Sequence, residues 1–378
     1  MNVQTRPSVR AAAVAAAAAQ WRDRGSPVRA RARESLAQSI WPPAAVETAL
    51  DNVLWDLDER RALELSAAAR GTPAAALVFL PGNIIGPAVQ SAFCAALAGA
   101  RAILKTADAE RGLASVASEQ FANSAHLAGT IEARDFRRGD LETESAALAE
   151  MNAVVAFGED ATIEQIRARA GERRVVGYGE SYSIAYVAGD TDIAAAAGLI
   201  ARDVCLFDQR GCMSPQTIFV AGEPGRALRH AHALARALGE DPIPRARSER
   251  GEEALVAAFV RRLAATALPP APHGLDTLLL GRSRDGAPEF AVALEPFGQP
   301  VCAGFGRIVI VKPAPSARDV ATQLRYFGRA IETIACSADT TQQERAAFTL
   351  AGAQRICALG EMQRPPFGYR PAIADFLL

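Results

Sequence analysis

Short, strongly apolar runs that alternate with helix-like segments constrain the fold of this chain more than any other feature. From residue 75 onward these runs are ALVFL, AILK, AVVAF, RVVGY and IAYV, at 76–80, 102–105, 153–157, 174–178 and 184–187. Apolar strands that alternate with helices are typical of a parallel sheet with helices on its faces. We therefore expect an α/β fold.

A second set of runs follows residue 216 and predicts a second α/β domain. Its expected strands are TIFV, TLLL, EFAVAL and RIVIVK, at 217–220, 277–280, 289–294 and 307–312, with helices at about 225–239 and 251–267. Residues 8–70 have no such runs. Their apolar side chains recur at helical spacing, which predicts a helical N-terminus with Trp55 in its packed core.

Composition narrows the function classes. Lys and Arg total 41 and Asp and Glu total 42, so the net charge of −1 gives no support to nucleic-acid or membrane-surface binding. No run of about 18 strongly apolar residues predicts a membrane span. The six cysteines form no CxxC pair or His-x-Cys cluster, so we expect no metal site, no disulfide framework and a reducing cytoplasm.

The run AAAVAAAAA, at 11–19 between flanking arginines, has two readings. Alanine is too weakly apolar for the core of a secretory signal, and we expect an alanine-rich helix. A transit peptide, which would be rich in arginine and poor in acids, stays open.

Cys212 is the candidate nucleophile. It lies in DVCLFDQRGCMSPQ, residues 203–216, where an apolar run gives way to polar and turn-forming residues before an expected strand. A thiol reacts as its thiolate, which requires partial exposure and a polar setting, and Arg210 could favour ionisation. A small buried loop residue is the alternative for a lone cysteine, so the interpretation depends on the surrounding loops.

One of those loops is LPGNIIGP, at 80–87, which follows the first expected strand. Its Asn83 could donate an amide N–H to the negative charge that develops when a thiolate attacks a carbonyl. A turn or helix-capping asparagine is the alternative.

Two further strand-end loops suit a nucleotide. LKTADAE, at 104–110, follows a strand at the edge where open α/β sheets bind ligands, so its polar residues could contact ribose hydroxyls: Lys105, Thr106 and Asp108. Asp108 would also repel a 2′-phosphate, and a solvated lysine is the alternative for Lys105. FGEDATIEQIRARA, at 157–170, starts a helix whose N-terminal N–H groups suit a pyrophosphate, at Phe157, Gly158 and Glu159. The dinucleotide fingerprint GxGxxG is absent.

Taken in order, these segments resemble the aldehyde dehydrogenase superfamily. LPGN, ILKTADAE and VVAFGEDATIEQI stand where that superfamily has its proline–tryptophan–asparagine turn, its lysine–proline–serine–glutamate strand end and its phenylalanine–threonine–glycine–serine turn. GESYSIAYVAGDTDI, at 179–193, resembles the segment that enters the catalytic domain, and Cys212 then falls at the nucleophile. DVCLFDQRGCMSPQ and RICALGEMQRPPF, at 355–367, resemble the acyl-CoA reductase branch, the LuxC type of fatty acid reductase.

The resemblance implies an aldehyde dehydrogenase-like fold. It divides the chain into an N-terminal helical region at 1–70, a Rossmann-type nucleotide-binding domain at 71–180 to which about 345–378 returns, and a catalytic domain at 181–344. It also implies reduction of an acyl-CoA or acyl thioester to an aldehyde, through an acyl-Cys212 intermediate and a hydride from NADPH or NADH. Asn83 would stabilise the oxyanion, and Gly179 and Glu295 would join the cofactor contacts. A homo-oligomer or a partner enzyme that handles acyl groups is implied as well.

The sequence departs from the hydrolysing dehydrogenases at one informative position. Val176 stands where they have the glutamate that activates water, so an acyl-enzyme here would be protected from hydrolysis. Three alternatives stay open: an NAD-dependent aldehyde dehydrogenase, an acyl-transfer enzyme without redox chemistry, and a non-catalytic partner that retains the fold.

Overall fold

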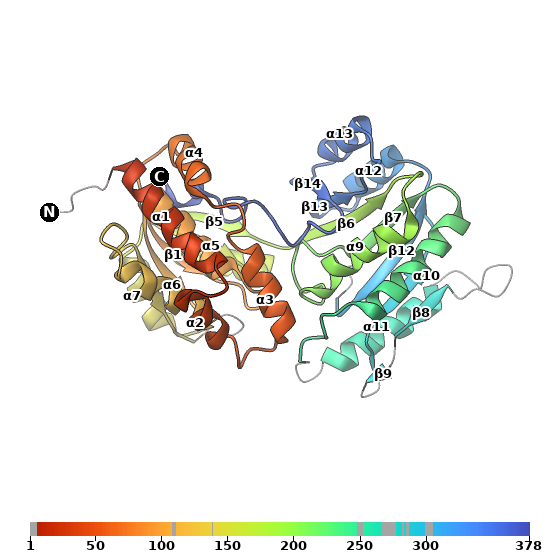
Figure 1. Cartoon of the computed structure of the whole chain (residues 1–378), viewed down its shortest axis with the longest axis horizontal. Helices are drawn as coiled ribbons and strands as arrows, with labels where there is room; N and C mark the ends of the chain where they lie inside the picture. The colour runs from red at the N-terminus through yellow and green to blue at the C-terminus, as the bar shows by residue number, and fades with distance from the viewer. Residues whose placement is uncertain are drawn as a thin grey trace. The chain divides into compact units, whose positions relative to one another are not determined.

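A computed structural model of the chain describes residues 6–107, 111–137, 139–247, 252–266, 277–281, 283–284, 287–298 and 305–378. The chain forms two compact units, one of Met1–Gly179 with Arg364–Leu378 and the other of Glu180–Gln363 (Figure 1). Each unit is an α/β structure built on its own sheet. The expected α/β fold class is confirmed.

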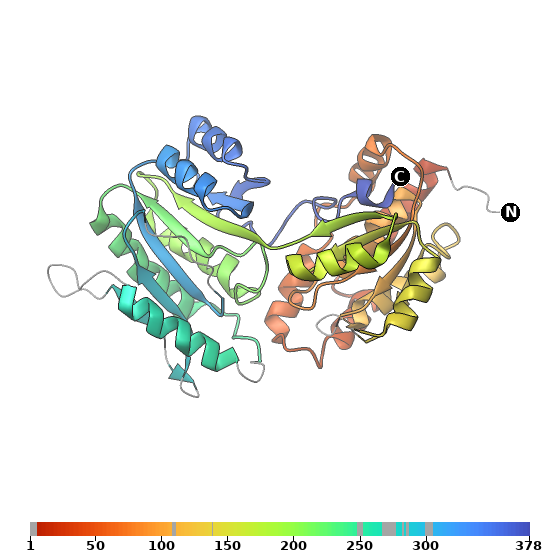
Figure 2. The same ribbon diagram turned by 180° about the vertical axis from the view of Figure 1, so that it is seen from behind.

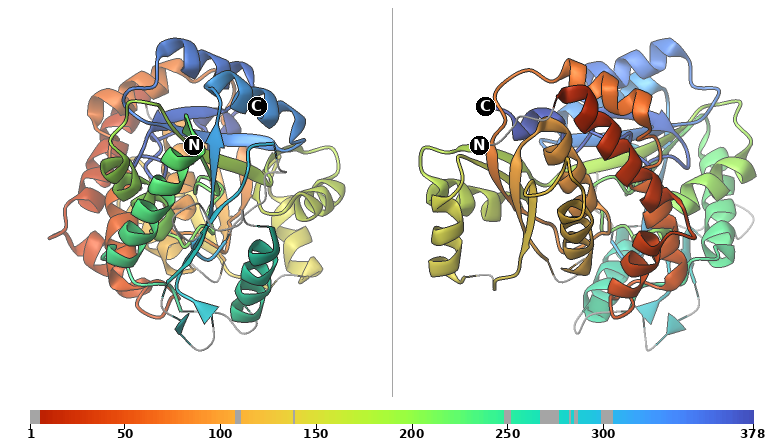
Figure 3. Two further views of the ribbon diagram at one scale, coloured as in Figure 1. Left: turned by 90° about the vertical axis from the view of Figure 1, so that its right-hand side faces the viewer. Right: turned by 60° about the vertical axis from the view of Figure 1, so that its left-hand side comes forward.

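The N-terminal region is helical, as expected. It comprises α1 (Pro7–Arg22), α2 (Pro27–Ser35), α3 (Pro43–Asn52) and α4 (Glu59–Ala68). Helix α1 is the alanine-rich segment, and it packs against α4 and α5, the first helix of the sheet that follows (Figure 3). Its Val14 and Trp21 are fully buried, and the Trp21 ring meets Phe93 edge to face with 6.4 Å between the ring centroids.

The prediction that Trp55 is packed core is wrong. Its side chain is 37% exposed in the turn between α3 and α4. The indole N–H donates to Pro365 O at 3.0 Å, and the Arg364 guanidinium lies 4.2 Å from the ring centroid. The helical spacing of apolar residues predicted burial of Trp55, but α3 ends at Asn52, so Trp55 does not lie on the buried face of that helix.

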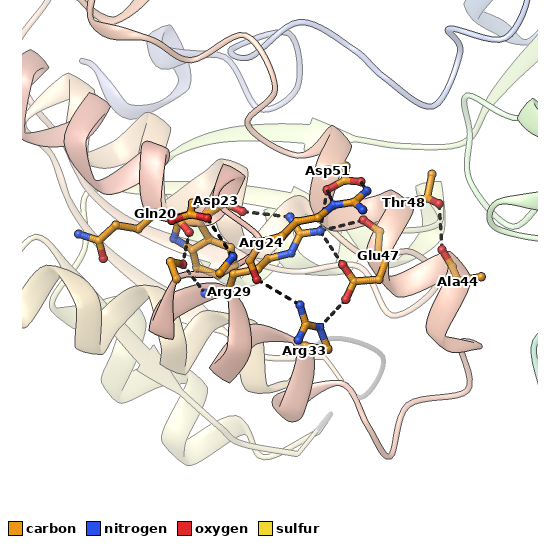
Figure 4. Close-up of polar contacts among 12 residues, drawn as sticks. Gln20, Asp23, Arg24, Arg29, Arg33, Ala44, Glu47, Thr48 and Asp51 are labelled. Atoms are coloured by element: carbon orange, nitrogen blue, oxygen red, sulfur yellow. Dashed lines mark hydrogen bonds and ion pairs between the residues drawn. The ribbon is translucent and has the colours of Figure 1, made fainter.

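A cluster of charges joins α1, α2 and α3 (Figure 4). The side chain of Arg29 is fully buried and donates to Trp21 O at 3.0 Å, to Glu47 Oε2 at 2.9 Å and to Asp51 Oδ1 at 2.7 Å. Arg24 and Arg33 add ion pairs to Asp51 and Glu47. A buried guanidinium is stable only when its charge is matched, and here two carboxylates match it.

The first sheet is five-stranded and entirely parallel, in the order β3-β2-β1-β4-β5. Its elements are β1 (Ala75–Phe79), α5 (Pro87–Ala98), β2 (Arg101–Lys105), α6 (Arg111–Ala122), β3 (Ile131–Arg134), α7 (Leu141–Ala149), β4 (Ala153–Phe157), α8 (Asp160–Ala170) and β5 (Arg174–Tyr178). Alternate side chains of β1 and β4 pack against α7 and α8, while α5 and α6 contact β2 and β3. The ribbon shows the two helix pairs on opposite faces of the sheet (Figure 2). The order reverses between β1 and β4, which is where doubly wound sheets open a crevice at their carboxyl edge.

The second sheet is seven-stranded, in the order β14-β13-β6-β7-β12-β11-β8, and only its pairing of β8 with β11 is antiparallel among the described residues. Its strands are β6 (Ser181–Val187), β7 (Thr217–Ala221), β8 (Leu278–Leu280), β11 (Ala291–Leu294), β12 (Ile308–Ala314), β13 (Ala330–Cys336) and β14 (Arg355–Ala358). A short hairpin pairs β9 (Ser283–Arg284) with β10 (Ala287–Pro288). The helices of this unit are α9 (Ile193–Cys205), α10 (Pro224–Glu240), α11 (Glu252–Thr266), α12 (Ala317–Tyr326) and α13 (Gln342–Leu350).

The chain returns to the first unit at Arg364, not at about 345 as expected. Helix α13 and β14 stay in the second unit because β14 pairs with β13 in parallel. The returning residues include the short 3₁₀ helix η2 (Ile373–Phe376), and Leu377 forms an isolated antiparallel bridge to Pro73. Among the described residues, no helix is long and apolar enough to cross a membrane.

Candidate active site

Cys212 lies on a turn between α9 and β7 whose backbone is strained. Asp208 and Gln209 both have positive φ, at 48° and 60°, a conformation that residues other than glycine rarely adopt. Such a conformation costs of order 1–3 kcal/mol per residue and persists where the surroundings impose it, often at functional sites. The strain therefore distinguishes this turn from an ordinary connection.

A buried ion pair imposes this conformation. Arg307 donates from Nε to Asp208 Oδ1 at 2.5 Å and from Nη2 to Ile243 O at 2.8 Å, and both charged side chains are almost fully buried. The second carboxylate oxygen of Asp208 accepts the Ala246 N–H at 2.8 Å. On the far side of the turn, Gln209 Nε2 donates to Pro215 O at 2.9 Å.

The backbone of Cys212 is itself held, while its side chain is partly exposed. Ser183, on β6, donates its hydroxyl to Cys212 O at 2.6 Å. The same hydroxyl oxygen accepts the Thr333 N–H at 3.1 Å, where the register between β6 and β13 shifts. Cys212 is intermediate in exposure, which is what a nucleophile needs.

Burial opposes ionisation of the other described cysteines, although Cys357 is intermediate in exposure like Cys212. Burial raises the pKa of the Cys94 thiol well above its ordinary value, and it raises the pKa values of Cys205, Cys336 and Cys357 to about 12. A thiol with so high a pKa is almost entirely protonated at neutral pH and is a poor nucleophile. Cys302 lies outside the described residues.

Arg210 has a different partner from the one expected. Its Nη2 lies 2.6 Å from both carboxylate oxygens of Glu252, at the start of α11, and both side chains are mostly buried. This pairing neutralises much of the guanidinium charge. Arg210 therefore fastens the turn to α11, and Glu252 shares its charge.

Asn83 follows β1, at the carboxyl edge of the first sheet. Its side chain is exposed, and helix α5 is capped three residues later by Gly86, so Asn83 is not the N-cap. Asn83 belongs to the first unit and Cys212 to the second. Their cooperation stays a prediction.

Lys105 and Thr106 end β2 as expected. Lys105 Nζ donates to Thr106 O at 3.0 Å and lies 5.6 Å from the Phe136 ring centroid. Thr106 is buried, and its hydroxyl donates to Asp135 Oδ1 at 3.0 Å. Asp135 follows the neighbouring strand β3 and is exposed. Asp108 lies outside the described residues.

The expected pyrophosphate loop begins α8. Phe157 ends β4 and stacks on Tyr178 with 4.8 Å between the ring centroids. Glu159 is the exposed N-cap of α8, and Asp160 is in its first turn. These carboxylates offset the positive end of the helix, which makes this terminus less favourable for a phosphate than the sequence pattern suggested.

Gly158 and Gly179, which carry no side chain, follow β4 and β5 at the carboxyl edge of the first sheet. A Cβ added at Gly179 would lie 2.0 Å from Asp160 Oδ1, so glycine leaves room there for the carboxylate. Val176 lies on β5, paired with Val155 of β4 in the first sheet.

Glu295 lies in the second unit at the end of β11. Its carboxylate is almost fully buried and forms an ion pair with Lys312 Nζ of β12 at 3.0 Å. The side chain of Lys312 is fully buried within the sheet. Glu295 is thus held in place by a charge that sequence inspection did not connect to it.

His230 is a fully buried residue of α10. Burial lowers the pKa of His230 to about 4, with Arg226 adding to the effect, so this imidazole is neutral at physiological pH. His273 lies outside the described residues. In the described parts of the chain, no group of three or more His, Cys, Asp or Glu side chains could hold a metal ion.

The partners of the turn were not predictable from local sequence. Ser183, Arg307 and Gln363 come from segments far from Cys212 in the chain. Two of them carried a signal: Gln363 lies in the RICALGEMQRPPF segment that resembles the reductases, and Ser183 lies in GESYSIAYVAGDTDI, which resembles the superfamily.

Comparisons with known proteins agree with this structure. The fold is similar to that of aldehyde dehydrogenase 21 from Physcomitrella patens, with a TM-score of 0.74 at 16% identity over 98% of this chain and 85% of that one. It is also similar to a NAD-dependent benzaldehyde dehydrogenase from Corynebacterium glutamicum, with a TM-score of 0.73 at 15% identity over 98% and 84% of the two chains. At these identities the likeness establishes the aldehyde dehydrogenase-like fold.

Sequence relatives are more specific. The chain is 29% identical over 149 residues to long-chain acyl-protein thioester reductase 2 of Photobacterium leiognathi, covering 38% of this chain and 31% of that protein. It is 28% identical over 109 residues to the long-chain acyl-protein thioester reductase of Vibrio harveyi, covering 29% and 23%. The matches thus span less than a third of each relative. The family model described as acyl-CoA reductase (LuxC) matches residues 44–370, which is most of the chain. This chain therefore belongs to the acyl-CoA reductase (LuxC) family.

Proposed function

We propose that the chain reduces an acyl thioester to an aldehyde through a covalent acyl intermediate on Cys212. The observation that carries the proposal is the contrast among the described cysteines. Cys212 is partly exposed on a strained, anchored turn, whereas Cys94, Cys205 and Cys336 are buried and Cys357, although partly exposed, lies within strand β14 with a raised pKa. The family is named for acyl-CoA, and the relatives are named for long-chain acyl-protein thioesters, so a long-chain acyl thioester is the proposed substrate.

The Cys212 thiolate attacks the thioester carbonyl, forms a new C–S bond and expels the carrier as a thiolate, which takes a proton from solvent. A reduced nicotinamide would supply the hydride that converts the acyl-enzyme to a thiohemiacetal. The bond to Cys212 then breaks, the aldehyde leaves and the Cys212 thiolate is restored. The overall reaction consumes one thioester, one reduced nicotinamide and one proton.

The negative charge on the carbonyl oxygen requires donors during acylation. We assign this role to the Asn83 amide and to a backbone N–H near Cys212. Support comes from the exposure of Asn83 at a strand end and from the resemblance of its loop to the superfamily. Donors fixed in advance stabilise developing charge more than mobile water does.

Val176 supports reduction over hydrolysis. An acyl-enzyme is hydrolysed when a general base activates water, and the position expected to hold that base carries an apolar side chain on β5. The acyl group would therefore remain on Cys212 until hydride transfer.

The residues of the first unit fit the adenosine part of a nicotinamide cofactor. The strand order reverses between β1 and β4, and Lys105, Thr106 and Asp135 gather at the carboxyl edge of β2 and β3. The remaining proposed contacts are Asp108, Phe157, Gly158, Glu159, Gly179 and Glu295.

We propose a preference for NADH over NADPH. The exposed Asp135 carboxylate, fixed by Thr106, would accept from a ribose hydroxyl and repel a 2′-phosphate. Arg137 is also exposed nearby and would have the opposite effect, but no hydrogen bond to Thr106 fixes it in the same way. A reducing cytoplasm and an acyl-handling partner or second copy remain part of the proposal.

One experiment tests the reaction, the substrate and the cofactor together. The protein is incubated with acyl-CoAs of graded chain length and with NADH or NADPH, while nicotinamide absorbance and intact mass are followed. We expect an acyl adduct on Cys212 and oxidation of the nicotinamide, with release of aldehyde. Cys212→Ala should show neither, and normal turnover in that variant would overturn the proposal.

The same measurements separate the alternatives. An adduct that no nicotinamide discharges would identify an acyl-transfer enzyme. Carboxylate formed from aldehyde with NAD⁺ would identify a hydrolysing dehydrogenase. A protein that acquires no adduct from any acyl-CoA would be a non-catalytic member of the fold.

A further inference from the structure

We propose that Gln363 is a positioning residue for Cys212 and acts through Ser214. The inference rests on the proposed nucleophilic role of Cys212. It concerns three residues of the second unit, Asp203, Gln363 and Ser214, which we call the Gln363 bridge. The bridge joins the two sequence segments that resemble the reductases, DVCLFDQRGCMSPQ and RICALGEMQRPPF.

Asp203 fixes the segment that carries Gln363. It lies in the last turn of α9 and is almost fully buried. Its Oδ2 accepts the Gly360 N–H at 2.8 Å, and its Oδ1 accepts the Met362 N–H at 3.0 Å. Each carboxylate oxygen therefore holds one backbone amide of the turn after β14, and Gln363 follows directly.

The side-chain amide of Gln363 spans two elements. Its Nε2 donates to Asp203 O at 3.1 Å and to Ser214 Oγ at 2.8 Å. The first bond satisfies one of the carbonyls that a helix leaves unpaired at its C-terminus. The second bond reaches the turn of the nucleophile. Both amide hydrogens are used, so the amide is fixed between α9 and that turn.

Ser214 passes this restraint to Cys212. Its N–H donates to Gly211 O at 3.0 Å, which closes a tight turn with Cys212 inside it. Ser214 is fully buried, so its hydroxyl contacts protein rather than bulk water. Ser183 holds the same turn from β6, through Cys212 O. Two residues distant in sequence, Ser183 and Gln363, therefore hold the turn at Cys212 O and at Ser214 Oγ, and we expect the direction of the thiol to depend on both contacts.

This arrangement predicts a specific kinetic effect. A nucleophile must approach the carbonyl in a near-attack geometry, and small displacements can reduce the rate by up to about 10²-fold. In this proposal Gln363 acts through the turn, by its bond to Ser214. Its loss should therefore lower the acylation rate and kcat while leaving KM for the acyl thioester nearly unchanged.

The test compares Gln363→Met with Gln354→Met. The first substitution keeps the side-chain length but removes both donors, and the second makes the same change at an exposed position before β14. Acylation by an acyl-CoA is followed by intact mass under single-turnover conditions, and folding is checked by thermal melting. We expect acylation to slow about 10- to 100-fold in Gln363→Met and to stay at the wild-type rate in Gln354→Met.

Ser214→Ala provides a second, smaller change if Gln363→Met fails to fold. It removes the acceptor of the same bond, so the two substitutions should not be additive: the double variant should be no slower than the slower single one. Alkylation of Cys212 by iodoacetamide, which needs no defined approach geometry, should change less than threefold in each variant.

Three outcomes would overturn the inference. They are wild-type acylation in folded Gln363→Met, multiplied losses in the double variant, and a rise in KM with unchanged kcat. Failure of the proposed function gives a different result, because the wild type would then acquire no acyl adduct, or Cys212→Ala would retain turnover.

Discussion

The turn that carries Cys212 and the strand-end loops of the first sheet are built in opposite ways. The Cys212 turn is fixed by a buried ion pair, by Ser183 and by Gln363, and its backbone is strained. The loops after β1, β2 and β3 present Asn83, Lys105 and Asp135 with little burial. One region has its geometry imposed by the interior of its own unit, and the other keeps polar groups accessible.

This difference matches two chemical tasks. A covalent nucleophile needs a defined direction of attack, and a buried framework supplies it. A binding loop needs donors and acceptors that can exchange water for a ligand, which requires exposure. Substitutions in the Cys212 turn should therefore affect both stability and rate, whereas substitutions in the loops should affect rate or specificity alone.

The largest effect is expected when the framework of the turn is broken. Arg307→Met leaves the buried Asp208 carboxylate without its cation, a change that typically costs about 3–5 kcal/mol. Chemical denaturation should show that loss of stability, and reductase activity should fall with it. Arg325→Met, at an exposed position on α12, is the matched control and should be near neutral. An equally small effect in both variants would contradict the view that the ion pair imposes the turn.

The exposed loop should respond in rate only. Asn83→Ala removes one proposed oxyanion donor, which is typically worth about 2.7–4 kcal/mol of transition-state stabilisation, or a roughly 10²- to 10³-fold loss in kcat. Its melting temperature should match the wild type. Asn123→Ala, at the exposed end of α6, serves as the control. Unchanged kcat in Asn83→Ala would remove this residue from the proposed mechanism.

A smaller effect is expected on cofactor choice. Asp135→Asn removes the carboxylate that we expect to repel a 2′-phosphate, and it should shift the ratio of kcat/KM for NADPH over NADH upward by about tenfold, or 1.4 kcal/mol. Steady-state kinetics with both cofactors measure the ratio. Asp339→Asn, exposed in the second unit, should leave it unchanged. A ratio that does not move would place the ribose elsewhere.

The smallest effect expected is a change in stability at acidic pH. Partial burial opposes ionisation of Glu47 and Asp51, but hydrogen bonds from their arginine partners outweigh it and lower the pKa of both carboxyls. Their contribution to stability is therefore present above the ordinary carboxyl range and is lost as pH falls below about 4.

The ionisation of Asp203 affects stability in the opposite direction. Burial raises the pKa of Asp203 to about 7, although the amides of Gly360 and Met362 favour its ionised form. Its ionisation costs stability above pH 7, and that cost declines as pH falls from about 7 toward 4. Hydrogen exchange at pH 7, 5 and 3.5, expressed as protection factors that remove the intrinsic pH dependence of amide exchange, should show higher protection around α9 at pH 5 and lower protection around α2 and α3 at pH 3.5. Lower protection around α9 at pH 5 than at pH 7 would contradict this expectation.

The sequence predicted those parts of the fold that depend on local pattern. β4 and β5 coincide with AVVAF and RVVGY because each is an uninterrupted strand-forming run. β3 was missed because IEAR carries two charges on an edge strand, and β13 was missed because Glu332 and Thr333 interrupt its apolar character. The side chains of Glu332 and Thr333 are fully buried, and their burial depends on contacts with other parts of the fold that the local sequence does not reveal.

The candidate site shows the same limit. Cys212 could be singled out from its polar turn and from the order of the loops before it. Its restraints could not, because Ser183, Arg307 and Gln363 are brought to it by strand pairing and by the chain's path through the second sheet. Arg210 was assigned to the thiol by proximity in sequence, but the structure pairs it with Glu252.

The return of residues 364–378 to the first unit has a consequence for synthesis. Leu378 exchanges backbone hydrogen bonds with Thr72, and Arg174 donates to Ala374 O at 3.0 Å. The ribosome must therefore translate the whole second unit before the first can be completed. Domains generally fold in the order in which they emerge from the ribosome. Here the unit that begins first is completed last, because its β5 edge stays partly uncovered until these residues have been translated. A released chain truncated after Gln363 should therefore contain a complete second unit and a first unit that chaperones still recognise.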